Sequence, residues 1–294
     1  MDKEIEVPTF GFHNYNSNIC YFNSLLQNII NCKYIMYYLI NEQTPKNKLQ
    51  KYFQSKFVKF TKLYNQEKQE EFLKETSMFS WELLNILLEK HNNININEQQ
   101  SSSEFFLYLI EELGIEHFFK IRHKINIHCG NCKNISSKID ECYHYEMFTS
   151  SDNSENNTVD IDHFMYNVNV LNDYKCDKCN TVSKAFYEKQ ALNICKYFVV
   201  ILNKYYNKSL IEFPNSFEIT VEKPNNTEHN APLISVWNNI GQIEHIGHLE
   251  SGHYIALCKR LNHIFLFNDT TVQMLKQNKM FATENTYVIF YEKQ

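Results

Sequence analysis

The chain has 294 residues, of which 43% are hydrophobic and 15% aromatic, so it can bury one large core or two small ones. Its formal net charge is -5 and its lysines and arginines are scattered, which argues against a nucleic-acid-binding surface. Only 6 glycines and 5 prolines are present, a composition that excludes fibrous and low-complexity classes.

The first residues are charged, and no apolar run is long enough to span a bilayer. We therefore expect neither a secretory signal nor a membrane partner. The 9 cysteines are an odd number, which argues against a complete disulfide framework. We therefore expect an intracellular protein, cytoplasmic, nuclear or both.

A cysteine marks the start of the first predicted helix. The polar segment 14–18 favours turns, because short polar side chains bond nearby backbone groups. From Leu25 to Ile40 apolar residues recur at helical spacing, so Cys20 falls at or near a helix N-terminus. The helix dipole there favours the thiolate, the nucleophilic form of cysteine. The alternative is an inert cysteine buried in the helix core.

Three more helices are predicted before residue 114. Residues 49–63 carry apolar side chains at spacings of three and four with lysines between them, which favours a core-packed helix with a solvated face. A helix lying on a membrane surface is the alternative. Another helix is predicted at 78–88. One of the serines at 101–103 can cap the next, which has Glu104 in its first turn.

Two cysteine knuckles follow, in a region that changes character near residue 121. Four thiolates brought together would suit the tetrahedral coordination of one structural Zn²⁺. A redox pair, or a site that has lost its metal, are the alternatives. The polar stretch 150–158 between the knuckles is expected to be a surface loop. The knuckles are Cys129-Gly130-Asn131-Cys132 and Cys176-Asp177-Lys178-Cys179.

Strands dominate the prediction from Tyr197 onward, because β-branched and aromatic runs recur there. The first of them, at 197–202, is continuously apolar and is typical of a buried strand. Further strands are predicted at 217–221, 233–236, 254–259, 264–267 and 287–291.

Two segments among these strands carry groups that could work with a cysteine. Gly252-His253-Tyr254 opens one predicted strand, and Asn268-Asp269 ends another. A histidine can take the proton of a thiol, and an amide or carboxylate can orient the imidazole. A lone histidine at a strand start is more often structural, and we interpret His245 and His248 in that way.

Several segments resemble, in order, the sequence boxes of the ubiquitin-specific proteases. The resemblance runs from about residue 11 to residue 291. The segments that carry it are Gly11-Phe12-His13-Asn14, Asn18-Ile19-Cys20-Tyr21-Phe22-Asn23-Ser24-Leu25-Leu26-Gln27, Gln99-Gln100-Ser101-Ser102-Ser103-Glu104-Phe105, Gly252-His253-Tyr254-Ile255-Ala256 and Phe267-Asn268-Asp269.

The resemblance implies an α+β, papain-like cysteine protease fold in a single catalytic domain, residues 1–294. A helical thumb would occupy about 8–120, zinc-tipped β fingers 121–195, and a β-rich palm 196–294. The order of helices before strands agrees with such a division.

The resemblance also implies a deubiquitinating thiol protease. Cys20 would be the nucleophile, His253 its base and Asn268 the group that orients His253. Asp269 would support this arrangement or polarise His253 through the same turn. Cys20 would attack the carbonyl of the C-terminal glycine of ubiquitin and form a thioester. Ubiquitin and ubiquitinated proteins would be the partners of a monomeric enzyme. The channel for the ubiquitin tail would be lined by Gln99, Gln100, Glu104, Gly252 and Tyr254, and the zinc would be held by Cys129, Cys132, Cys176 and Cys179.

The loop before the cysteine departs from the family pattern. It has one extra residue between Asn14 and Cys20, and Ser17 stands where the family has glycine. The family places its oxyanion asparagine five residues before the cysteine, where this chain has Tyr15. We expect Asn14 to serve the oxyanion hole, with Asn16 as the alternative.

Two other functions remain open. The altered loop before Cys20 would suit a pseudoenzyme that binds ubiquitin without cleaving it. Ser101 replaces an aspartate that contacts the ubiquitin tail in the family, which leaves open a protease for a ubiquitin-like modifier.

Overall fold

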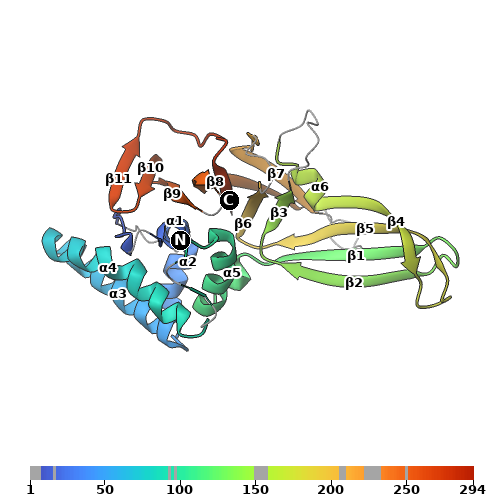
Figure 1. The fold of residues 1–294 in the computed structure, drawn as a ribbon, viewed down its shortest axis with the longest axis horizontal. Helices are drawn as coiled ribbons and strands as arrows, with labels where there is room; N and C mark the ends of the chain where they lie inside the picture. The colour runs from blue at the N-terminus through green and yellow to red at the C-terminus, as the bar shows by residue number, and fades with distance from the viewer. Residues whose placement is uncertain are drawn as a thin grey trace.

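The computed structural model describes residues 8–15, 18–91, 94–95, 98–148, 158–204, 210–221, 233–248 and 251–294. Helices occupy the first part of the chain and two β-sheets the rest, so the expected α+β class is confirmed (Figure 1). Asn16, Ser17 and nearly all of the loop expected at 150–158 lie outside the described residues. Among the helices of the described ranges, none combines the length and apolar character needed to cross a membrane.

The helical layer differs from the prediction where one helix was expected from Leu25 to Ile40. The first helix ends at Asn31, because Cys32 leaves the helical conformation at φ -78° and ψ 87°. The N–H of Tyr34 donates to the Tyr197 hydroxyl at 3.1 Å, a tertiary contact that overrides the helical pattern. The helices are α1 (Cys20–Asn31), α2 (Lys33–Tyr37), a π-helix (Tyr38–Glu42), α3 (Lys48–Asn65), α4 (Gln69–Leu88), α5 (Ser102–Leu113) and a 3₁₀ turn (Glu116–Phe118).

The lysine-rich helix α3 packs into the core, as expected. It buries an apolar stripe that includes Phe53, Phe57 and Phe60, and each such side chain contributes roughly 1.5–3 kcal/mol by leaving water. On its outer side Lys56 and Lys59 pair with Glu75 of α4 at 3.1 and 2.9 Å. The basic face therefore meets acidic side chains of the neighbouring helix.

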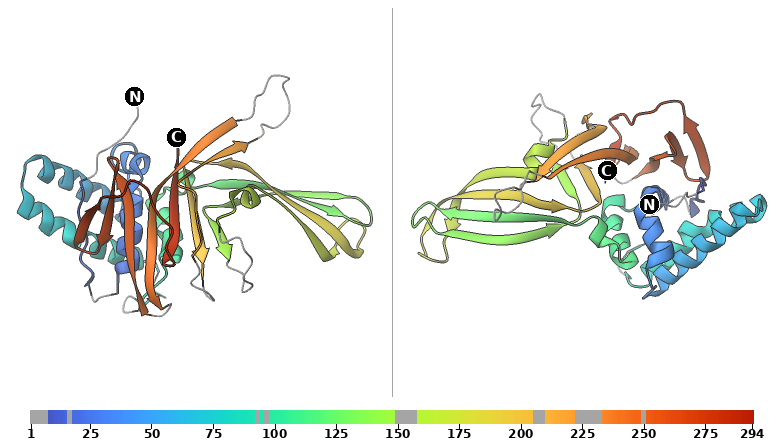
Figure 2. Two further views of the ribbon diagram at one scale, coloured as in Figure 1. Left: turned by 90° about the horizontal axis from the view of Figure 1, so that it is seen from above. Right: turned by 180° about the vertical axis from the view of Figure 1, so that it is seen from behind.

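A four-stranded antiparallel sheet in the order β2-β1-β5-β4 projects away from the rest of the molecule (Figures 1 and 2). We call it the finger sheet. Both cysteine knuckles lie at the ends of its strands. Its strands are β1 (Ile121–Cys129), β2 (Ile135–Cys142), β4 (Tyr166–Lys175) and β5 (Val182–Ile194).

An eight-stranded sheet, the palm sheet, forms the centre of the protein. Its order is β11-β10-β9-β8-β12-β6-β3, with β7 also paired to β8. The strand expected at 197–202 is buried along its whole length, as predicted. The strands are β3 (Tyr145–Phe148), β6 (Tyr197–Asn203), β7 (Ser216–Val221), β8 (Leu233–His248), β9 (Ser251–Arg260), β10 (His263–Asn268), β11 (Thr271–Leu275) and β12 (Thr286–Lys293), and the short helix α6 (Ile161–Met165) precedes β4.

Two cores cover opposite sides of β6. Val199 and Ile201 join the core of the helical layer, whereas Phe198 and Val200 join a second core with Trp237. Helix α1 packs against β8 and β9 and is buried along nearly its whole length. The first residue of α1 is thereby held against the strand that carries His253.

Candidate active site

Cys20 is the first residue of α1, as the sequence predicted. The carbonyl of Ile19 accepts the N–H groups of Phe22 and Asn23 at 3.0 and 2.9 Å, which starts the helix at this point. The first turn of α1 holds no acidic residue, so no nearby negative side chain of this turn cancels the positive end of the helix dipole at the sulfur. The Cys20 side chain is fully buried, so its surroundings are set by its immediate neighbours.

His253 on β9 lies against both Cys20 and the end of β10. Its Nε2 is 2.8 Å from Oδ1 of Asn268. Because an amide oxygen only accepts, Nε2 carries the proton and Nδ1 is left for Cys20. The hydrogen bond with Cys20 is the main cause that raises the pKa of His253 to about 9, against the opposing effect of burial. The Asn268 bond and the charges of Cys20 and Asp269 act in the same direction.

Asp269 forms the turn between β10 and β11 and connects three segments. Its Oδ2 lies 3.8 Å from Nε2 of His253, and its Oδ1 accepts from Nδ2 of Asn23 at 2.8 Å. Its carbonyl accepts from the N–H of Phe12 at 2.9 Å, and a Cβ on Gly11 would come within 2.3 Å of that oxygen. The close approach explains why glycine stands at position 11.

Asn23 has a role that the sequence analysis missed. It lies three residues after Cys20 and therefore on the same face of α1, a spacing that could have identified it. Its buried amide ties this helix to Asp269 and, at 3.5 Å, to the carbonyl of His13.

Asn14, the expected oxyanion donor, is bound to the backbone of the residue before Cys20. Its Oδ1 accepts from the N–H of Ile19 at 2.9 Å. This bond fixes which end of the amide faces the backbone and leaves the NH₂ group to donate elsewhere. Asn16, the alternative, lies outside the described residues.

The residues expected to line the tail channel are partly brought together. Gln99 bonds to Gly252, and its Nε2 lies 3.5 Å from Sγ of Cys20. Gln99, Gln100 and Tyr254 line a cavity of about 140 Å³ between the helical layer and the palm sheet. Glu104 lies in the first turn of α5 and is not among the described residues that line this cavity.

The two histidines interpreted as structural differ in their surroundings. His245 is buried and stacks on Tyr254, with ring centroids 4.3 Å apart and planes 16° from parallel. His248 is exposed at the end of β8, where it pairs with Ser251. The contact with Cys20 thus distinguishes His253 from both of them.

The four knuckle cysteines meet at the far end of the finger sheet. Their sulfur atoms all lie within 4.8 Å of one another. Two pairs across the knuckles, Cys132 with Cys176 and Cys129 with Cys179, are 3.7 and 3.9 Å apart. Tetrahedral zinc with Zn–S bonds of about 2.3 Å would place its sulfurs about 3.8 Å apart, so the donor set fits one such ion.

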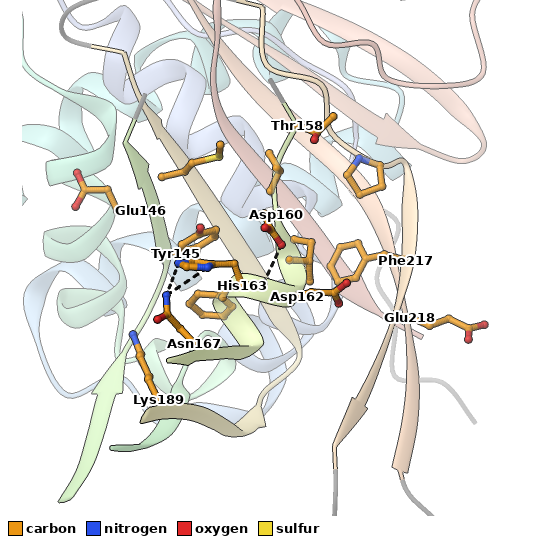
Figure 3. A pocket seen from close by; sticks show the side chains of 15 residues that line it. Tyr145, Glu146, Thr158, Asp160, Asp162, His163, Asn167, Lys189, Phe217 and Glu218 are labelled. Carbon is orange, nitrogen blue, oxygen red and sulfur yellow. Dashed lines mark hydrogen bonds between the residues drawn. The ribbon is translucent and has the colours of Figure 1, made fainter. Parts of the chain in front are cut away.

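A second cavity, larger than the one beside Gln99, lies apart from Cys20 and His253. It measures about 930 Å³ and lies at the base of the finger sheet, between α6, β3, β5 and β7 (Figure 3). Asp160 accepts from the N–H of His163 at 2.8 Å and caps α6, with Asn167 beside the His163 ring. None of the described residues that line this cavity is a cysteine.

Comparison with known proteins identifies the family of this chain. A family model described as ubiquitin carboxyl-terminal hydrolase matches residues 10–291. Ubiquitin carboxyl-terminal hydrolase 8 of Saccharomyces cerevisiae is 29% identical over 133 residues, which cover 40% of this chain and 28% of that protein. A probable ubiquitin carboxyl-terminal hydrolase 8 of Schizosaccharomyces pombe is 22% identical over 262 residues, or 80% and 53% of the two chains. The chain therefore spans about half or less of these relatives.

Solved structures share the fold. A chain of the SAGA Ubp8/Sgf11/Sus1/Sgf73 DUB module bound to ubiquitin aldehyde superposes with a TM-score of 0.74 at 18% identity, covering 97% of this chain and 70% of that one. A chain of the module that contains a point variant of Ubp8 and is bound to monoubiquitin gives 0.72 at 18% identity, with 100% and 70% covered. These likenesses confirm the expected papain-like fold. Because the family model spans nearly the whole chain, this protein belongs to the ubiquitin carboxyl-terminal hydrolase family.

Proposed function

We propose that this protein is a cysteine-type deubiquitinase that hydrolyses the bond after the C-terminal glycine of ubiquitin through Cys20, His253 and Asn268. The observation that carries the proposal is the contact of Cys20, at a helix N-terminus, with His253, whose Nε2 is held by Asn268 at 2.8 Å. A cysteine, an imidazole and an orienting amide are the parts of a thiol protease.

The reaction would begin with transfer of the Cys20 proton to Nδ1 of His253. The raised pKa of His253 favours this ion pair, because the imidazolium keeps its proton near neutral pH. Cys20 then attacks the glycine carbonyl, and His253 returns the proton to the leaving lysine amine. Water, with His253 as base, hydrolyses the thioester and releases ubiquitin.

The negative oxygen of the tetrahedral intermediate needs donors. The N–H of Cys20 opens α1, where the first N–H groups have no partner within the helix. The NH₂ group of Asn14 is the second donor, because its Oδ1 is already bound to Ile19. Preorganised donors of this kind stabilise the transition state without rearranging during the reaction.

Asn268 and Asp269 divide the support of His253. Asn268 makes the shorter contact and fixes the tautomer, while Asp269 adds negative charge at 3.8 Å. We predict that Asn268→Ala lowers kcat by roughly ten- to ten-thousand-fold, the range for orienting residues. Steady-state rates on a ubiquitin amide measure the effect. A far larger loss in Asp269→Ala would reverse the two roles.

We also propose one structural Zn²⁺ at the tip of the finger sheet. The knuckles stand at the ends of two β-hairpins, at the end of the sheet that points away from the palm sheet (Figure 1). A four-thiolate site would tie the hairpins together and contribute its binding energy to folding. The four cysteines are the ligands named in the sequence analysis.

The partner we propose is ubiquitin. The similar modules are bound to ubiquitin aldehyde and to monoubiquitin, which supports a ubiquitin-binding role here. Those modules contain several subunits, so the expectation of a monomer is not supported. The thumb, finger and palm boundaries and the cellular compartment remain predictions.

One observation favours a second candidate, a protease for a ubiquitin-like modifier. The hydroxyl of Ser101 lies 2.9 Å from that of Tyr287, so this side chain is engaged within the protein. A serine also carries no charge with which to bind a basic tail.

A panel of propargylated modifiers, each able to trap a reactive cysteine, tests the proposed function. We expect ubiquitin to label Cys20 fastest, with the adduct located by mass spectrometry. Faster labelling by another modifier would support the second candidate. Ubiquitin binding with no labelling by any probe would identify a pseudoenzyme and refute the proposal.

A further inference from the structure

Two sets of hydrogen bonds join the helical layer to the palm sheet beside the reaction centre. In the first, Nε2 of Gln99 donates to the carbonyl of Gly252 at 2.5 Å, and the N–H of Gly252 donates to Oε1 of Gln99 at 2.8 Å. In the second, the hydroxyls of Ser101 and Ser103 lie 2.9 and 2.8 Å from the hydroxyl of Tyr287. Both sets involve residues just before or at the start of α5.

The first set occupies the groups that a substrate tail would use. An extended peptide pairs with a strand through the backbone N–H and C=O of the residue it passes. Gln99 satisfies both of these groups on Gly252, and its Nε2 also lies 3.5 Å from Sγ of Cys20. A peptide tail cannot lie between Gln99 and Gly252 unless these bonds break. The channel to Cys20 is therefore closed in this structure.

On the palm side of the channel, Gly252 cannot shift away from Gln99, because other residues are packed behind it. A Cβ on Gly252 would come within 2.1 Å of Nε2 of His245, so the imidazole lies directly against this glycine. His245 is itself buried and stacked on Tyr254. Opening must therefore come from Gln99 and the start of α5.

The second set holds that start in place. Ser101 is the N-cap of α5 and accepts from the N–H of Ser103 at 3.3 Å, and their hydroxyls are 2.7 Å apart. Together with the hydroxyl of Tyr287 on β12 they form a closed triangle of hydrogen bonds. The triangle fixes the first turn of α5 relative to the palm sheet. It thereby also fixes Gln99, which lies two residues before the N-cap Ser101.

We propose that Tyr287 is a positioning residue that keeps the channel closed in the free enzyme, with Gln99 as the latch that a modifier tail displaces. The inference rests on the proposed function. A substrate that binds only the open form has its apparent affinity reduced by the fraction of closed protein. Loosening the tether therefore strengthens binding, whereas the chemistry after binding is unchanged.

The variant Tyr287→Phe removes the hydroxyl and keeps the ring. We expect the Kd for monoubiquitin, measured by calorimetric titration, to fall by roughly three- to ten-fold, the effect of one or two lost hydrogen bonds on the closed form. On a ubiquitin amide, KM should fall while kcat changes by less than about two-fold. Tyr291→Phe is the matched control, because it lies on the same strand but loses a bond to the carbonyl of Pro214.

Amide hydrogen exchange tests the latch without substrate. The N–H of Gly252 should exchange slowly in the wild type and faster in both Tyr287→Phe and Gln99→Ala, with no change in Tyr291→Phe. Unchanged exchange in Tyr287→Phe, or weaker ubiquitin binding by it, would overturn the proposal. If the exchange rates change as expected but no variant binds ubiquitin, the latch stands and the proposed function fails instead.

Discussion

The residues that we propose as catalytic depend on contacts between segments that are far apart in the sequence. Asp269 receives hydrogen bonds from Asn23 on α1 and from the backbone of Phe12, and it lies 3.8 Å from His253. Its φ of 50° is in the left-handed region, which aspartate tolerates better than most residues. The side chains at the reaction centre are thus oriented by buried polar partners rather than by their own strands alone.

The first prediction at this scale concerns pH. His253 has a pKa of about 9, above its ordinary value of 6.5, so the charged form that pairs with the thiolate is present at neutral pH and is lost as pH rises through about 9. We expect kcat/KM for a ubiquitin amide to fall above about pH 9. Asp269→Asn should shift this fall in kcat/KM to lower pH, because the substitution removes a nearby negative charge. If the fall occurs at the same pH in the variant, Asp269 does not support His253 electrostatically.

The second prediction concerns the oxyanion donor. Asn14→Ala should lower kcat by about a hundred- to a thousand-fold with little change in ubiquitin affinity, because the donor acts on charge that develops only in the transition state. Asn16→Ala is the control and should have a mild effect. The comparison uses one ubiquitin amide substrate for both variants. If Asn16→Ala is the impaired variant, the extra residue of this chain lies on the other side of Asn16.

Among the elements, the finger sheet shows most clearly how far the sequence can be interpreted. Two Cys-x-x-Cys spacings were enough to predict that four sulfurs meet, because a metal site is specified by a few local ligands. The strand at 233–236 proved to be part of β8, which runs to His248, since polar residues such as Gln242 and Glu244 are buried there by neighbours that the sequence does not identify. Tyr287 was expected only as a strand residue, because its bonds to α5 join distant segments.

A prediction at the scale of elements tests the metal. Protein purified without chelator should contain about one zinc per chain, and Cys176→Ser should lose the metal and lower the unfolding temperature. The same variant should lose little of its activity on a small substrate, because Cys20 belongs to the core of the helical layer and not to the finger sheet. Cys195→Ser is a suitable control, since this residue is not among the four clustered cysteines. A wild-type protein that contains no zinc and is nevertheless fully stable would contradict the proposed metal site.

At the scale of the whole molecule, the palm sheet and the helical layer meet at the proposed active site, and each contributes part of it. Cys20 belongs to the helical layer and His253 to the palm sheet, so the site exists only when α1 is docked against β9. The α+β class and this pairing could be predicted from the order of sequence motifs. The closed contact between Gln99 and Gly252 could not, because it depends on how the two layers are spaced.

The most direct test of the account is turnover of a ubiquitin C-terminal fluorogenic amide by the wild-type chain and by Cys20→Ala. Removing the nucleophile should abolish hydrolysis, because the remaining groups cannot form the thioester, while ubiquitin binding by titration stays close to that of the wild type. Normal turnover by Cys20→Ala, or an inactive wild type that binds ubiquitin, would contradict the assignment of this chain as a cysteine deubiquitinase.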